Sequence, residues 1–192
     1  MNQFARGDAC VAASCGQAVI REEIPRDILA REALLDRAFG LTRWRKTSER
    51  LREGRLPAPG LAFTAVLDGV LVGTLRFWSI EAGEGRDALL LGPIAISASL
   101  RSQGLGGRMI RLGLERAAAL GHKAVILVGD APYYARFGFS RAGAEKLDMP
   151  GPVELARFLA LELQPGALEG AQGLIRATGA FIESEGARRL AA

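Results

Sequence analysis

Apolar segments with the composition of strands are clearest in the middle of the chain. Residues 61–67 and 70–80 predict two strands, and Asp68-Gly69 between them is a strong hairpin signal. A turn with two glycines leads to a third strand over residues 88–96, and residues 124–128 form the unbroken apolar run of a buried parallel strand. Because a helix lies between these last two strands, they should form a crossover unit and run parallel.

Segments in which apolar residues recur with helical spacing lie before, between and after these strands. Residues 25–39 predict a helix that ends at Gly40, with an apolar face of Ile28, Leu29, Leu34, Leu35, Ala38 and Phe39. Further helices are expected over residues 42–53, over residues 105–120 and, more briefly, over residues 132–137. The candidates for burial on the longest of these are Leu105, Met109, Leu112 and Leu120. With a first strand over residues 18–22 and later strands over 139–147 and 158–163, the pattern predicts an α+β fold.

The length of 192 residues fits one domain. We expect a disordered leader over residues 1–17, the domain itself over 18–163, and an extension over 164–192 that packs on the same domain. The chain has 25 basic and 21 acidic residues, and its arginines are scattered, which argues against a nucleic-acid surface. Cys10 and Cys15 match no zinc or redox spacing, and His122 is the only histidine. No apolar run approaches a membrane span, so a cytoplasmic protein without a membrane or nucleic-acid partner is expected.

The chemistry is concentrated where the strand over 88–96 gives way to a helix. The loop carries Gly104, Gly106 and Gly107, and glycines let the backbone approach a ligand closely. The first turn of a helix adds unpaired N–H groups and a partial positive charge, which suits pyrophosphate, and Arg101 and Arg108 could add charge-assisted bonds. A simple tight turn is an equally good explanation of the glycines alone. The P-loop pattern is absent, and Met109 stands where the dinucleotide fingerprint requires glycine.

The loop also contains the pattern R/Q-x-x-G-x-G/A, as RSQGLG at residues 101–106. With the strand segment IAI before it and YYARFGF after it, this resembles the acetyl-CoA signature of the GNAT superfamily of N-acetyltransferases. The segments LGPIAI, YYARFGF and PGAL are similar to the branch of predicted N-acetyltransferases labelled YhbS. The resemblance covers most of the chain beyond the leader.

The resemblance implies the GNAT acyl-CoA N-acyltransferase fold, a mixed central sheet of about seven strands flanked by helices. Its fourth and fifth strands would be parallel and splayed, so that they admit the pantetheine arm of acetyl-CoA. Backbone groups of Ile94, Ala95 and Ile96 would bond that arm as an added strand. The pyrophosphate would bind the loop and helix start, formed by Arg101, Ser102, Gln103, Gly104, Leu105, Gly106 and Gly107.

The resemblance also implies a catalytic role for Tyr134, which matches the family's frequent general acid at the leaving thiolate. A tyrosine hydroxyl, with an ordinary pKa of about 10, can donate to a thiolate whose thiol has a pKa of about 8.5 without full proton transfer. Tyr133 is grouped with the cofactor-binding residues, although packing of its helix on the sheet is the favoured explanation for it. Many relatives carry an asparagine where Asp130 stands, and Asp130 either replaces it or caps the helix.

The acceptor half of the reaction is open at this stage. Glu22, Glu23 and Glu81 are candidate bases near strand ends, although a carboxylate in such a position is more often simply solvated. Trp44, Phe77 and Trp78 are candidates to line an acceptor pocket or to fill the core. The expected function is acetyl transfer to a primary amine of a small molecule or peptide, and the alternative is a non-catalytic acyl-CoA-binding or regulatory module. Whether the chain forms a homodimer is also open.

Overall fold

The computed structural model describes residues 17–182. Nearly all of the expected leader, Cys10 and Cys15, and the end of the expected extension at residues 183–192 lie outside the described residues. In the described part no helix is both long and apolar enough to cross a bilayer.

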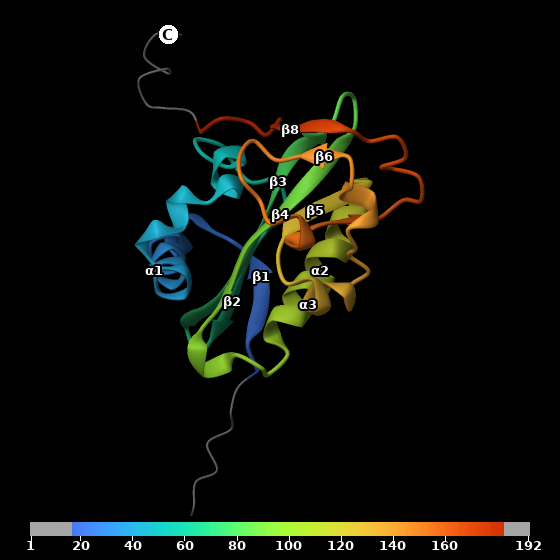
Figure 1. The fold of residues 1–192 in the computed structure, drawn as a ribbon. Coiled ribbons are helices and arrows are strands. Elements are labelled where there is room, and N and C mark those ends of the chain that lie inside the picture. The colour runs from blue at the N-terminus through green and yellow to red at the C-terminus, as the bar shows by residue number, and fades with distance from the viewer. Residues whose placement is uncertain (1–16, 183–192) are drawn as a thin grey trace, which may run out of the picture.

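A mixed sheet of eight strands forms the centre of the molecule (Figure 1). Its main path runs β1-β2-β3-β4-β5-β7, and β8 pairs with both β3 and β6. Among the strand pairs of residues 17–182, β4–β5 and β6–β8 are the parallel ones, so the expected crossover unit is confirmed. The strand bounds are Val19–Glu22 for β1, Ala62–Leu67 for β2, Val70–Ala82 for β3, Asp87–Ile96 for β4, Ala124–Val128 for β5, Leu147–Asp148 for β6, Phe158–Glu162 for β7 and Gly173–Ala177 for β8.

The predicted hairpin between β2 and β3 is confirmed. Asp68 and Gly69 both have a positive φ, of 48° and 78°, as a tight two-residue turn with the twist of a hairpin requires. Leu67 and Val70 are then directly paired across the turn. This pairing sets which side chains of the two strands reach the core.

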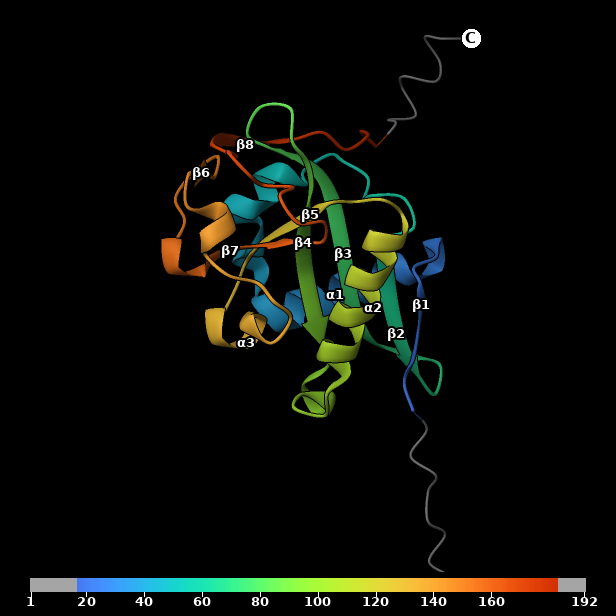
Figure 2. The same cartoon turned by 90° about the vertical axis from the view of Figure 1, so that its right-hand side faces the viewer.

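Helices cover the two faces of the sheet (Figure 2). Helix α1 (Ile28–Phe39) lies on one face and α2 (Leu105–Ala119) on the other, while α3 (Ala131–Ala135) follows β5. The larger core cluster lies beneath α2 and contains Phe77, Met109 and Ile110, each fully buried. The burial of large apolar side chains in this cluster is the main interaction that holds α2 on the sheet.

The predicted apolar face of α1 is partly wrong. Leu34 and Leu35 are buried, but Leu29 is 85% exposed and Arg31 is buried in its place. Arg31 can be buried because it forms ion pairs with Glu23 and Glu32. Leu112 and Leu120 of the second long helical stretch, also expected to be buried, are 37% and 44% exposed.

Two further predictions of secondary structure fail. The expected helix over residues 42–53 is instead two short 3-10 helices, Leu41–Arg45 and Thr47–Leu51. The expected strand over residues 139–147 is reduced to a bridge between Ser140 and Ala160, a 3-10 turn and the two-residue β6. β6 then adds to β8, which itself pairs with the end of β3.

Candidate active site

Strands β4 and β5 separate soon after they begin to pair. Their register contains only two partners, Leu89 with Val125 and Leu90 with Ile126. Beyond these the ladder between β3 and β4 is interrupted by a bulge at Gly92, whose carbonyl accepts a hydrogen bond of 2.6 Å from the Trp78 indole. The expected splay is therefore present, and the bulge turns the end of β4 away from β5.

The peptide groups of the three residues expected to bind the pantetheine arm do not all point in the same direction. Ser97 donates its N–H to the Val72 carbonyl at 2.7 Å, and the alternation of an antiparallel ladder then turns the peptide groups of Ile96 and Ile94 away from β3. Ala95 faces the other way, with its backbone in the β3 ladder and its side chain buried under α1. Two of the three peptide units thus point into the gap left by β5.

The glycine loop forms a cavity of about 550 Å³ at the start of α2. Gly104 takes the left-handed conformation at φ 81° as the N-cap residue, and Ser102 is also left-handed at φ 62°. A Cβ on Gly106 would lie 3.3 Å from the Tyr133 hydroxyl and 3.5 Å from Ile96 Cγ1, so the absence of a side chain keeps this groove open. The residues around the cavity are Ile96, Leu100, Arg101, Ser102, Gly104, Leu105, Gly106, Gly107, Arg111, Tyr133 and Arg136.

The cations of this cavity differ in part from those expected. Arg101 lines it, but Arg108 points toward the Ala18 carbonyl, 3.4 Å away just before β1. Arg111 and Arg136 take its place, held beside the aromatic rings of α3 and the residues after it. Arg111 lies one helical turn after Gly107 on the same face, so its spacing could have identified it. Arg136 is brought there only by the packing of α3. Gln103 does not line the cavity, and its amide donates to the Ser99 carbonyl at 3.0 Å.

Tyr134 lines a second cavity, of about 280 Å³, between the separated strands. Its ring is 9% exposed and packs edge-on against Tyr133 at 5.1 Å and Phe139 at 5.9 Å between centroids. Burial raises the pKa of Tyr134 to about 12, with the neighbouring Tyr133 acting in the same direction. The phenol therefore stays protonated over the whole ordinary pH range.

The two consecutive tyrosines lie in different cavities. Tyr133 lines the one at the glycine loop, and Tyr134 lines the one between β4 and β5. Asp130 caps α3 by accepting a hydrogen bond of 3.1 Å from the Tyr133 N–H. The structure therefore shows the capping role expected for Asp130. The Tyr134 N–H also donates to the Asp130 carbonyl at 3.0 Å, so the backbone of both tyrosines is bonded to Asp130.

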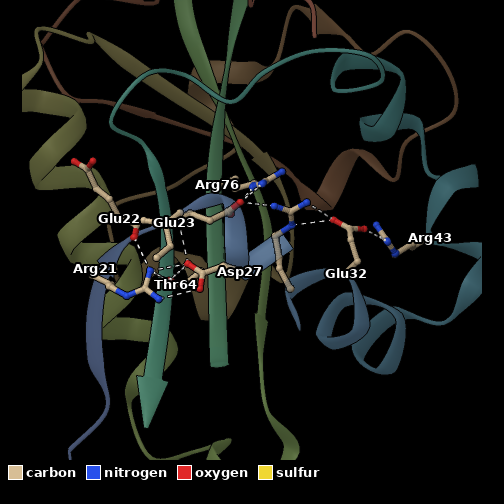
Figure 3. A network of polar contacts seen from close by, with 10 residues as sticks. Arg21, Glu22, Glu23, Asp27, Glu32, Arg43, Thr64 and Arg76 are labelled. Carbon is tan, nitrogen blue, oxygen red and sulfur yellow. Dashed lines mark hydrogen bonds and ion pairs between the residues drawn. The ribbon is translucent and has the colours of Figure 1, made fainter. Parts of the chain in front are cut away.

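The three carboxylates considered as bases are not at this cavity. Glu81 lies opposite Asp87 at the far end of the β3–β4 pair, where it accepts a hydrogen bond from the Gly85 N–H at 2.9 Å. The Glu22 carboxylate points away from the ion-pair network of Figure 3. Glu23 lies inside that network, bonded to Arg31 and Arg76. Burial raises the pKa of Glu23 to about 6, opposed by Arg31.

A third cavity, of about 310 Å³, adjoins the one beside Tyr134. Trp44 and Trp78 line it, and Trp78 is also part of the core, whereas Phe77 is fully buried in the core against α2. Glu49 lines both this cavity and the one beside Tyr134, with a side chain 17% exposed. The sequence pattern missed Glu49 because it lies in a polar stretch with nothing to distinguish it from a solvated helix face.

Comparison with known proteins identifies the family. The model of the acetyltransferase (GNAT) family matches residues 29–139. The chain belongs to this family.

Its relatives include the N-acetyltransferase YhbS of Escherichia coli, whose function is uncharacterized. The two sequences are 32% identical over 158 residues, which is 82% of this chain and 94% of YhbS. The crystal structure of YhbS in complex with CoA superposes with a TM-score of 0.71 over 84% of this chain and 89% of that one. A GNAT acetyltransferase from Brucella melitensis in complex with acetyl-CoA is 25% identical, with a TM-score of 0.63 over 84% of this chain and 96% of that one.

Proposed function

We propose that this GNAT N-acetyltransferase binds acetyl-CoA along the open edge of β4 and uses Tyr134 to stabilise the leaving thiolate. The pyrophosphate lies in the cavity of the glycine loop, where the α2 N-terminus and three arginines favour negative charge. The pantetheine arm takes the place of the missing β5 partner and bonds the peptide groups of Ile94 and Ile96. Its thioester then reaches the cavity that Tyr134 lines.

The reaction is a direct attack of a neutral amine on the thioester carbonyl. The new C–N bond forms first, and collapse of the tetrahedral intermediate breaks the C–S bond. The electron pair goes to sulfur, where the Tyr134 hydroxyl donates a hydrogen bond. Because the pKa of Tyr134 is near 12, the phenol remains neutral and available as this donor. The proton that the amine loses balances the one that CoA gains as a thiol.

The observation that carries this proposal is the placement of a buried, protonated tyrosine beside the gap between β4 and β5. The cavity there is open, with about 280 Å³ between its walls. An open cavity favours catalysis over the alternative of a non-catalytic acyl-CoA-binding module, which needs no space for a second substrate. We also propose that the enzyme acts in the cytoplasm, where its cosubstrate acetyl-CoA is available.

The test is a pair of tyrosine variants. Tyr134→Phe should lower kcat by about 10²- to 10⁴-fold, as expected for one general acid, while acetyl-CoA still binds. Tyr133→Phe is the matched control, because it removes a hydroxyl from the neighbouring cavity and should change kcat far less. Thiol release gives kcat and calorimetry gives the Kd of acetyl-CoA. A Tyr134→Phe enzyme with the kcat of the wild type would remove Tyr134 from the mechanism.

A further inference from the structure

The cavity beside Tyr134 has a cationic wall. Arg43 lies in the first 3-10 helix after α1, Lys46 lies between that helix and the second, and Arg52 directly follows the second. Arg157 ends the 3-10 helix before β7. Within residues 17–182, the acidic side chains that line the same cavity are Glu49 and Asp130. The charge of the wall is therefore positive, although the reaction needs an uncharged amine there.

Arg43 does not contribute a free charge to this wall. Its Nε donates to Asp36 at 2.8 Å and its Nη2 bonds Glu32. Glu32 also bonds Arg31, which continues the chain of ion pairs toward Glu23 (Figure 3). This network neutralises its arginines within the protein, so it holds the wall in place without leaving charge for a ligand.

Arg52 is different, because its partners are mostly neutral. Its side chain is 8% exposed, and its Nε and Nη2 donate to the carbonyl and hydroxyl of Ser48 at 3.0 and 2.6 Å. The nearest carboxylate oxygen, on Glu49, is 3.6 Å away, and within residues 17–182 no hydrogen bond from Nη1 is found. A buried guanidinium without a hydrogen-bonded carboxylate is costly, and an anion in the cavity would offset that cost. Burial correspondingly lowers the pKa of Arg52.

Lys46 and Arg157 extend the same positive field. The pKa of Lys46 is lowered by burial and by the charges of Arg52 and Arg157, which means that the three cations lie near enough to repel one another. Asp130 offsets little of this, because its carboxylate already caps α3. Glu49 is the remaining acid, and it lies beside Arg52 on the same wall.

Acetyl-CoA does not account for these cations. Its phosphates belong in the cavity of the glycine loop, which has its own arginines in Arg101, Arg111 and Arg136. The pantetheine arm that reaches Tyr134 is uncharged. The cations beside Tyr134 are therefore left for the other substrate.

We propose that the acceptor is an amino carboxylate, whose carboxylate binds Arg52 and Lys46 and whose ammonium is received by Glu49 before it loses its proton. The inference rests on the proposed function, since it assigns the acceptor of the same site. A guanidinium and a carboxylate side by side complement the two charges of a zwitterion, and charge-assisted bonds to both ends fix the amine toward the thioester. Neutral or polycationic amines satisfy only the Glu49 side.

Matched acceptors test this directly. Each of a set of α- and ω-amino acids is compared with its carboxamide, and a simple alkyl amine and a polyamine are included, with thiol release from acetyl-CoA as the readout. We expect kcat/KM to be at least about 10-fold higher for the acid than for its amide, the scale of one hydrogen bond to a charged group. Equal or better use of the amides or polyamine would overturn the inference while leaving the acetyltransferase function intact. Thiol release with none of the acceptors would count against both.

Variants locate the binding group. Arg52→Gln should raise KM for the preferred acid by about 10- to 100-fold and leave KM for its amide nearly unchanged. Lys46→Gln is an exposed substitution that leaves the buried wall intact, and it should produce a smaller change of the same kind. Arg45→Gln is the control, because Arg45 is exposed, directly precedes Lys46 in the sequence and does not line the cavity. Loss of the acid-over-amide preference in Arg52→Gln or Lys46→Gln supports the assignment, whereas an unchanged preference in both, with each variant folded, contradicts it.

Discussion

Gly129 offers a way to move Tyr134 without removing any of its atoms. It follows β5 directly, and a Cβ there would lie 2.2 Å from Cε2 and 2.7 Å from Cδ2 of the Tyr134 ring. Ordinary contacts of a Cβ begin at 3.4 Å, so in Gly129→Ala the ring must shift by more than 1 Å. The φ of Gly129 lies outside the left-handed region, so alanine causes no backbone strain and the methyl group alone acts.

A displacement of this size should lower kcat by about 100-fold, since a misplacement of about 1 Å can have that effect on a positioned group. Such a loss corresponds to about 2.7 kcal/mol of activation free energy. The Kd of acetyl-CoA should change less than kcat, because Gly129 does not line the cavity of the glycine loop, where we propose that the phosphates bind. The free energy of unfolding should fall by about 1–3 kcal/mol from overpacking. Thiol release, calorimetry and denaturant unfolding measure the three quantities.

Gly113→Ala is the control for crowding of an aromatic ring in general. Its Cβ would lie 2.6 Å from Cε2 and 2.8 Å from Cζ of Phe77, under α2 and outside the Tyr134 cavity. It should destabilise the protein to a similar degree and lower kcat far less. A double-mutant cycle of Gly129→Ala with Tyr134→Phe adds a second check, because the two losses should not add if both act through the hydroxyl. An unchanged kcat in folded Gly129→Ala, or fully additive losses, would refute the role given to Tyr134.

Three further predictions concern the loop, the first strand and the bulge. Gly106→Val should raise the Kd of acetyl-CoA by at least about 10-fold in calorimetry, because the side chain fills the groove that receives the cofactor. Hydrogen bonding to Arg21 lowers the pKa of Asp27 to about 2, so its stabilisation is complete above its ordinary pKa and is lost as the pH falls through about 2. Between pH 5 and 2 the free energy of unfolding should therefore fall by about 2 kcal/mol more in the wild type than in Asp27→Asn. Trp78→Phe leaves the buried Gly92 carbonyl unpaired and should cost about 1–3 kcal/mol in denaturant unfolding.

The parts of the fold that were predictable from sequence are those in which local signals agree. Asp68-Gly69 between two strand-like segments predicts a tight turn, because both residues adopt a positive φ readily. The spacing of the glycines before α2 predicts the loop at its start. The parallel β4–β5 pair followed from chain connectivity. The cavity of the glycine loop is built on these elements, which is why most of the residues that line it could be anticipated.

The surroundings of the cavity beside Tyr134 depend on contacts that sequence spacing does not encode. Arg31 replaces Leu29 on the buried face of α1 because Glu23 and Glu32 neutralise it, and no local pattern marks such a partnership. The stretch expected as a helix over 42–53 becomes two 3-10 helices, which brings Arg43, Lys46, Glu49 and Arg52 to one cavity. Tertiary contacts over long sequence separations, such as Arg50 to the Pro150 carbonyl at 2.6 Å, hold this segment against the rest of the molecule.

The most direct test of the account is a count of both products of one reaction. Purified enzyme is given acetyl-CoA and an amino carboxylate, and free CoA thiol and N-acetylated product are measured together by thiol titration and mass spectrometry. The account predicts one thiol for each N-acetyl group formed, with both falling together by about 10²- to 10⁴-fold in Tyr134→Phe. Thiol release without an N-acetylated acceptor, or equal rates of product formation in the wild type and Tyr134→Phe, would contradict it.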